Sequence, residues 1–192
     1  MVSGMTYDTN NQEDCHYKTH PLHLTITTMF RQELAQFSIF QGLTSQQLDV
    51  LELVMEPCNL KKDKGIFEQG DSASFLYILL SGEVVVHFQP YDGPSLTVAH
   101  ILPGGVFGWS AALNRDYYTS GARAVVESNA VRLTTQGLHS LCENDPETGR
   151  LILDHLAGNI AERLRNTHSQ VLTILSQGID PKDTCRRRSG IE

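Results

Sequence analysis

Several features that would assign this sequence to a particular protein class are scarce or missing. The four cysteines, Cys15, Cys58, Cys142 and Cys185, lie far apart and form no C-x-x-C pair. Their spacing argues against a zinc ribbon and against a disulfide-dense secreted scaffold. No apolar run approaches the roughly 20 residues that span a bilayer, and the N-terminal stretch has no apolar segment of a secretory signal. We therefore expect a soluble protein of the cytoplasm that does not enter a membrane.

Positive charge is also in short supply. The chain has 15 Lys and Arg residues against 22 Asp and Glu residues, which gives a formal net charge of -7. A surface of that sign does not attract phosphate backbones, so general nucleic-acid binding is disfavoured. The length of 192 residues, with 40% hydrophobic and 19% charged residues, suits one domain with a packed core and loose ends.

The N-terminal part of the chain combines a polar tail with short helical patterns. Residues 1–28 are polar and unpatterned, and we predict a flexible tail there. A short helix is expected from Met29 to Phe37. A second helix is expected from about 45 to 55, because Thr44 and Gln47 form a capping-box pattern ahead of apolar residues at helical spacing.

The central region, from about 58 to 136, has the pattern of an antiparallel β-roll. Short apolar runs alternate there with Gly, Asp and Pro, which is typical of short strands joined by tight turns. The expected fold is therefore mainly β, a jelly-roll-like arrangement with N-terminal helices and a long C-terminal helix. The predicted strands are FLYILL (75–80), EVVVHF (83–88), SLTVAHIL (95–102), SGARAVV (120–126) and AVRLTT (130–135).

Helical signals return in the C-terminal part, at about 138–175. A short helix is followed by a long one from about 146, since Pro146 suits a first helical turn. Apolar residues of the long helix step alternately by four and three, as in a heptad seam. The seam residues are Leu153, Ala157, Ile160, Leu164, Thr167, Val171 and Ile174.

This seam favours a homodimer formed through residues 150–175. The alternative is a stripe that only packs on the β-roll. The globular domain is expected to span residues 29–176, and residues 177–192 to form a flexible basic tail.

A glycine-rich segment in the β region indicates a ligand site. Pro103-Gly104-Gly105 forms a turn, and Gly108 is expected to open a short helix at about 108–113 whose free N–H groups attract an anion. Hydroxyl groups from a nearby strand would lie at the edge of the ligand. The predicted ligand-binding residues are Gly108, Trp109, Ser110, Ala111, Tyr118, Thr119 and Ser120. The alternative is that these glycines serve turn geometry alone.

The order of motifs between residues 64 and 126 resembles the cyclic-nucleotide-binding domains of the catabolite-activator and fumarate–nitrate-regulator type. The resemblance covers about residues 30–175 and implies a regulatory β-roll that binds a cyclic nucleotide such as cAMP or cGMP. The matching positions are Phe67, Gly70, Asp71, Tyr77, Ile78, Gly82, Val84, Pro103, Gly104, Phe107, Gly108, Thr119 and Ala124.

Two positions depart from the pattern of this family. Its ribose-binding Glu position is Trp109 here, and its phosphate-binding Arg position is Tyr118. Because a charge-assisted hydrogen bond contributes about 1.5–3 kcal/mol, losing both contacts should weaken cyclic-nucleotide binding strongly. With Tyr117, these aromatic residues either stack on a planar ligand or fill the pocket. The ligand therefore stays open between a cyclic nucleotide, another small anion and no ligand at all.

Other kinds of site find little support in the sequence. His87 and His100 lie in predicted strands, as in metal-dependent cupins, but no H-x-H motif with a nearby Glu accompanies them. We expect no metal, and no catalytic motif predicts an enzyme. About 16 residues follow Ser176, too few for a helix-turn-helix module, so we expect no DNA binding by this chain.

Two functional hypotheses follow from these patterns. The first is a regulatory sensor that binds a small anionic or nucleotide-like ligand at a helix N-terminus and signals through the C-terminal helix. The second is a degenerate, ligand-free module used for dimerisation or for docking on a separate effector protein.

Overall fold

The structure, a computed structural model, describes residue 34 and residues 36–178, with side chains up to residue 165. The chain divides into two compact units, Met1–Leu156 and Ala157–Glu192. The predicted tail 1–28, most of the predicted helix 29–37 and nearly all of the tail 177–192 lie outside the described residues. Within those residues, no helix has the length and hydropathy that crossing a bilayer requires.

Residues 36–54 contain two short helical elements ahead of the β region. The 3-10 helix η2 spans Ser38–Phe40, and α2 spans Ser45–Glu52. The predicted capping box at the start of α2 is confirmed: the Gln47 N–H donates to Thr44 Oγ1 at 3.3 Å, and the Thr44 N–H donates to Gln47 Oε1 at 2.9 Å. The helix ends earlier than the predicted residue 55, because Met55 already belongs to the first strand.

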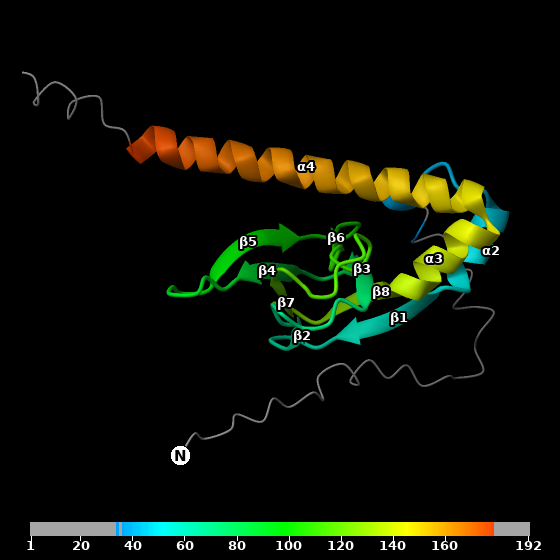
Figure 1. Ribbon diagram of the computed structural model, residues 1–192, viewed down its shortest axis with the longest axis horizontal. Coiled ribbons are helices and arrows are strands. Elements are labelled where there is room, and N and C mark those ends of the chain that lie inside the picture. The colour runs from blue at the N-terminus through cyan, green and yellow to red at the C-terminus, as the bar shows by residue number, and fades with distance from the viewer. Residues whose placement is uncertain (1–33, 35, 179–192) are drawn as a thin grey trace, which may run out of the picture. The chain divides into compact units, whose positions relative to one another are not determined.

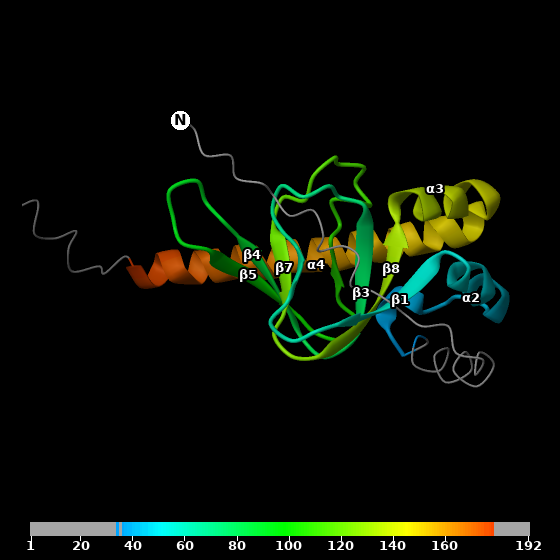
Figure 2. The same cartoon turned by 90° about the horizontal axis from the view of Figure 1, so that it is seen from below.

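Eight antiparallel strands form two four-stranded sheets, which confirms the predicted β-roll (Figure 1). The first sheet has the order β1 (Met55–Leu60), β8 (Ser128–Thr134), β3 (Phe75–Ser81) and β6 (Val106–Phe107). The second has the order β2 (Gly65–Phe67), β7 (Gly121–Ala124), β4 (Val84–Phe88) and β5 (Leu96–Ile101). The hairpin formed by β4 and β5 projects beyond the neighbouring strands (Figure 2).

The first sheet separates two hydrophobic cores. Alternate residues of its strands point to opposite faces, so Leu76 and Ile78 of β3 face one core while Tyr77 and Leu79 face the other. We call the first the helix-side core, because it includes residues of η2, α2 and the C-terminal helices. The second, here the interior core, lies between the two sheets and takes residues from both.

Two helices follow the sheets, α3 (Thr135–Asn144) and α4 (Pro146–Gly178). The predicted start of the long helix at Pro146 is confirmed. Within the first unit, Ile152 and Leu156 of α4 are buried in the helix-side core, whereas the seam residue Leu153 is exposed. The residues of α4 that pack on the core are therefore offset by one position from the seam at Leu153.

Candidate functional site

The segment after β6 differs from the short helix predicted for residues 108–113. Its backbone N–H groups donate to carbonyl groups three, four and five residues earlier in the chain. The bonds run from Ala111 to Gly108 at 3.2 Å, from Leu113 to Trp109 at 3.0 Å, and from Arg115 to Ser110 at 3.0 Å. A helix needs one repeated spacing, so this segment is a series of turns. The prediction of a helix at 108–113 was therefore wrong, whereas the anion site predicted at Gly108–Ala111 stays a prediction.

Gly108 begins this segment in a conformation that suits glycine. Its φ angle is +73°, and a Cβ atom placed there would lie 2.8 Å from the carbonyl oxygen of Phe75 and 3.0 Å from Cδ2 of Tyr77. An L-residue rarely adopts such a φ, and both neighbours are fixed in the core. The glycine at 108 therefore lets the backbone pass close to β3, whatever the site binds.

Tyr118, a predicted ligand residue, points into the interior core. Its ring stacks on Phe67, with the ring centroids 3.8 Å apart. Its hydroxyl donates to the carbonyl oxygen of Phe75 at 2.7 Å and accepts from the Phe75 N–H at 3.0 Å. Both hydrogen-bonding roles of the phenol are thus used within the protein.

Burial also keeps this phenol protonated. Desolvation raises the pKa of Tyr118 to about 12, and the negative charge of Asp71 acts in the same direction. The side chain is thus uncharged at neutral pH and well into the alkaline range, with its O–H donating to the Phe75 carbonyl.

The rings around Tyr118 form an aromatic column between the two sheets. Phe67 lies 5.7 Å from Tyr77, and Tyr77 lies 4.9 Å from Phe107 with ring planes 10° apart. Phe75 extends the group, 6.2 Å from Tyr77. We did not single out these residues as part of the site. For Tyr77 the signal in the sequence was the alternation within residues 75–79, which places it on the same face as Leu79.

The loop between β2 and β3 holds the backbone of Tyr118. The Gly70 N–H donates to the Tyr118 carbonyl at 2.9 Å, and the Tyr118 N–H donates to the Asp71 carbonyl at 2.9 Å. The Asp71 side chain closes the loop by accepting the Glu68 N–H at 2.8 Å. These contacts fix the position from which the side chain of Tyr118 enters the interior core.

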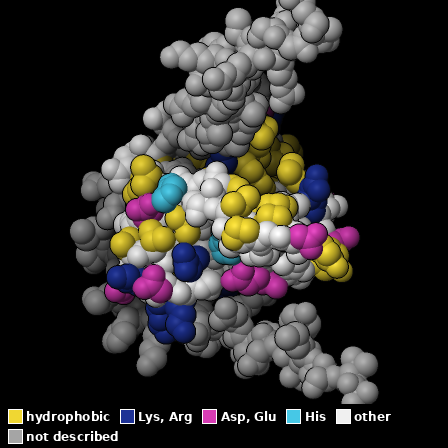
Figure 3. All heavy atoms as spheres, turned by 90° about the vertical axis from the view of Figure 1, so that its left-hand side faces the viewer, with side chains coloured by type: hydrophobic (Ala, Val, Ile, Leu, Met, Phe, Trp, Pro, Cys, Tyr) yellow, Lys and Arg dark blue, Asp and Glu magenta, His cyan; other side chains and the backbone are white. Residues whose placement is uncertain are grey.

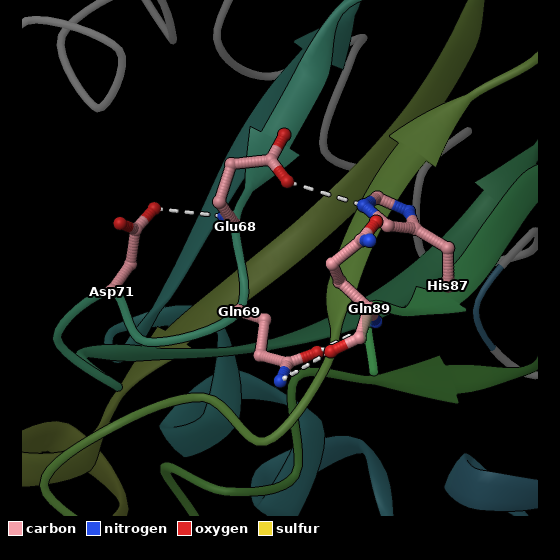
Figure 4. Close-up of polar contacts among 5 residues, drawn as sticks. All are labelled: Glu68, Gln69, Asp71, His87 and Gln89. Atoms are coloured by element: carbon pink, nitrogen blue, oxygen red, sulfur yellow. Dashed lines mark hydrogen bonds and ion pairs between the residues drawn. The ribbon is translucent and has the colours of Figure 1, made fainter. Parts of the chain in front are cut away.

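Side chains of the same loop bind β4 and its hairpin (Figure 4). Glu68 Oε2 lies 3.1 Å from Nε2 of His87, and the Gln89 N–H donates to Gln69 Oε1 at 2.9 Å. The loop is thereby tied to the second sheet as well as to Tyr118. The loop thus contacts both the backbone of Tyr118 and the hairpin of β4 and β5.

The structure brings only some of the predicted ligand residues together. The Thr119 N–H donates to the buried Ser110 Oγ at 3.4 Å, Thr119 is exposed, and Ser120 is half-buried. Trp109 instead packs against the helix-side core, and Ala111 is buried in the interior core. Only Thr119 and Ser120 thus remain accessible among the predicted hydroxyl residues, while both residues at the positions of the charged family contacts pack in the protein.

The two strand histidines each contact a different glutamate. His87 lies against Glu68, and Nδ1 of His100 lies 2.6 Å from Oε1 of Glu83. Among the residues that the structure describes, no three His, Cys, Asp or Glu side chains gather as they would around a metal ion.

Comparison with known proteins found similarity to cyclic nucleotide-binding domains. Residues 57–145 match the family described as the cyclic nucleotide-binding domain. A CRP-like cAMP-activated global transcriptional regulator of Mycobacterium tuberculosis is 27% identical over 142 residues, which are 74% of this chain and 62% of the relative. The chain thus spans less than two thirds of the length of that regulator.

Solved structures are similar to this chain as well. The catabolite activator protein of Thermus thermophilus has 28% identity and a TM-score of 0.60, and the match covers 72% of this chain and 62% of that protein. A cyclic nucleotide-binding domain from Methylobacillus flagellatus matches with a TM-score of 0.69 over 77% of this chain and 85% of its own. At 19% identity the second likeness shows the fold alone.

Proposed function

Because this chain carries a cyclic nucleotide-binding domain with homologues among CRP-like regulators, we propose that it is a non-catalytic regulatory domain whose nucleotide site is closed by Tyr118. The buried position of Tyr118, with its ring stacked on Phe67 and its hydroxyl bound to Phe75, carries the proposal. Its output passes through α4 to a partner protein.

The chemistry of the two substituted positions supports this proposal. The resemblance places a phosphate-binding Arg at Tyr118, and a neutral phenol does not compensate the charge of a cyclic phosphate. It places a ribose-binding Glu at Trp109, whose indole packs on the helix-side core instead. Each missing charge-assisted contact should cost about one to two powers of ten in affinity.

A second candidate function is the sensing of a different small ligand at the surface of the same segment. Its support is the exposed Thr119 and the half-buried Ser120, which the bond from the Thr119 N–H to the buried Ser110 Oγ ties to the glycine turn. Hydroxyls in such a place can bind a small anionic or nucleotide-like molecule. In this case the aromatic column would be unchanged by binding.

We expect cAMP and cGMP to bind the unmodified chain with a dissociation constant above about 10 μM, measured by titration calorimetry. The double variant Trp109→Glu, Tyr118→Arg should bind at least about tenfold more tightly, because it restores both charged contacts. It should also be less stable without ligand, since an unpaired guanidinium would be buried in an aromatic core.

The matched control is the single variant Trp109→Glu, which leaves the aromatic column complete. It should gain little affinity, because Tyr118 still closes the site. Sub-micromolar binding of cAMP by the unmodified chain would disprove the closed site. An unchanged melting temperature of the unmodified chain with each small anion or nucleotide tested would count against the second candidate.

We propose in addition that the seam of α4 forms a homodimer through residues 150–175. Leu153 and Leu164 of this seam are exposed, and Leu164 is 62% accessible to solvent. Two such helices would bury these leucines against each other, as in a coiled coil.

On this basis Leu164→Glu should produce a monomer in sedimentation velocity at micromolar concentration, with an unchanged β-sheet circular dichroism signal. Two glutamates facing each other across the dimer axis would cost several kcal/mol, whereas one exposed glutamate costs little. The control is Leu53→Glu, at a leucine that is 85% exposed on the end of α2. If the two variants have the same oligomeric state, the seam is not part of the dimer interface.

A further inference from the structure

Strand β5 forms an unusually open edge of the second sheet. It ends the order β2, β7, β4, β5, so the described strands pair with it on one side only. Proteins protect such edges with proline, with lysine or with very short strands. The other three edge strands follow this rule, because β1 contains Pro57, β2 has three residues and β6 has two. β5 has six residues, and neither proline nor lysine is among them.

The side chains around this edge are apolar and exposed. Leu96 of β5 lies directly opposite Phe88 of β4, and both are exposed, as are Val98 and the turn residue Tyr91. Figure 3 views the molecule from the side on which the tip of this hairpin lies in Figure 1, and hydrophobic side chains gather there between charged ones. The open edge therefore comes with an apolar surface, which is typical of a contact site.

The charge around β5 indicates what kind of partner fits. Residues 93–114 contain no Asp, Glu, Lys or Arg, and His100 of β5 already contacts Glu83. A charged peptide would find no ion pair along this edge. A second copy of the same strand would meet no like charge directly opposite, which would otherwise destabilise the pairing.

We propose that β5 pairs antiparallel with β5 of a second copy of this chain, so that two four-stranded sheets join across a two-fold axis. Such an interface is self-complementary, because the outward N–H groups of each strand can donate to the outward C=O groups of the other. Both copies also bring the apolar group of Phe88, Leu96 and Val98 to the contact. This contact is separate from the seam of α4 and does not depend on it.

The size of the contact sets its expected strength. Pairing two six-residue strands with their flanking apolar side chains would bury on the order of 1,000 Å² in total, at the low end of specific interfaces. We therefore expect a weak dimer, with a dissociation constant of about 10–100 μM. A contact of this strength would form only where the local concentration of the chain is high.

The test is sedimentation equilibrium of the full chain carrying Leu164→Glu, which removes association through the seam. This parent should still associate up to about 200 μM, and adding Val98→Lys should weaken the association at least about tenfold by placing two lysines at the shared edge. The control is Val126→Lys, because Val126 lies between β7 and β8 and is 42% exposed, against 41% for Val98.

Three outcomes would overturn the proposal. The first is a parent that stays monomeric up to about 200 μM. The second is equal weakening by Val98→Lys and Val126→Lys. The third is hydrogen exchange of residues 96–101 that does not slow with rising concentration of the parent, since edge pairing must protect the outward amides of this strand. Slower exchange there, lost in Val98→Lys, would support it.

Discussion

Replacing Tyr118 with alanine should lower the free energy of unfolding by about 3–5 kcal/mol, one of the largest effects of any single substitution in this chain. The substitution removes a ring stacked on Phe67 and opens a cavity in the interior core. It also leaves the N–H and carbonyl of Phe75 without the Tyr118 hydroxyl. Urea denaturation at pH 7 measures the effect.

Tyr118→Phe separates the ring from the hydroxyl. It keeps the stacking and should cost about 1–3 kcal/mol at pH 7, because only the two hydrogen bonds with Phe75 are lost. An alanine variant no less stable than the phenylalanine variant would show that the ring contributes nothing to the core. A phenylalanine variant as stable as the parent would show that the hydroxyl is not held as described.

The same phenol should make stability depend on alkaline pH. Its pKa is about 12 in the folded protein and about 10 in the unfolded chain, so the folded state holds the proton more tightly. The stabilisation is therefore complete below about pH 10 and is lost as the pH rises toward 12, with a slope of up to about 1.4 kcal/mol per pH unit. Tyr118→Phe should lack this part of the slope, which denaturation at several alkaline pH values would show.

Gly108→Ala should lower the free energy of unfolding by about 3 kcal/mol. A left-handed backbone costs alanine roughly 1–2 kcal/mol, and the new Cβ would overlap the Phe75 carbonyl, which adds an overpacking cost of about 1–3 kcal/mol. Denaturant titration of the variant measures the sum. The same close approach should also displace the turn that holds Ser110.

Gly70→Ala is the matched control. Gly70 has a φ of +92°, but nothing lies within 4 Å of a Cβ atom placed there. The free energy of unfolding of this variant should therefore fall only by the cost of the left-handed backbone, about 1–2 kcal/mol. Equal losses in the two variants would mean that the approach of Gly108 to β3 carries no energetic cost.

Local signals in the sequence were enough to predict most of the secondary structure. Thr44 and Gln47 marked the start of α2, Pro146 marked the start of α4, and glycine turns separated the longer strands. We missed β1, whose first residue, Met55, we had placed at the end of the preceding helix. We also missed β2 and β6, which have three and two residues, too few to display an alternating pattern. They form because neighbouring strands are already in place to pair with them.

The candidate site was harder to predict, because its geometry depends on tertiary contacts. The run Trp109–Leu113 has the composition of a short helix, yet Trp109 packs on one core and Ala111 on the other, which leaves room only for turns. The inward direction of Tyr118 depends on the loop containing Gly70 and Asp71, which is remote in sequence. No local pattern carries that information.

The central position of β8 in the first sheet has a consequence for how the chain folds. β8 pairs with both β1 and β3, and the bond between Arg132 and Glu56 joins residues 76 positions apart. Neither neighbour can complete its pairing until β8 has left the ribosome, so the earlier strands emerge with their apolar faces uncovered. Folds dominated by such non-local pairings fold slowly, in the range of milliseconds to seconds. We therefore expect the nascent chain to expose apolar strand faces until residue 134 is released.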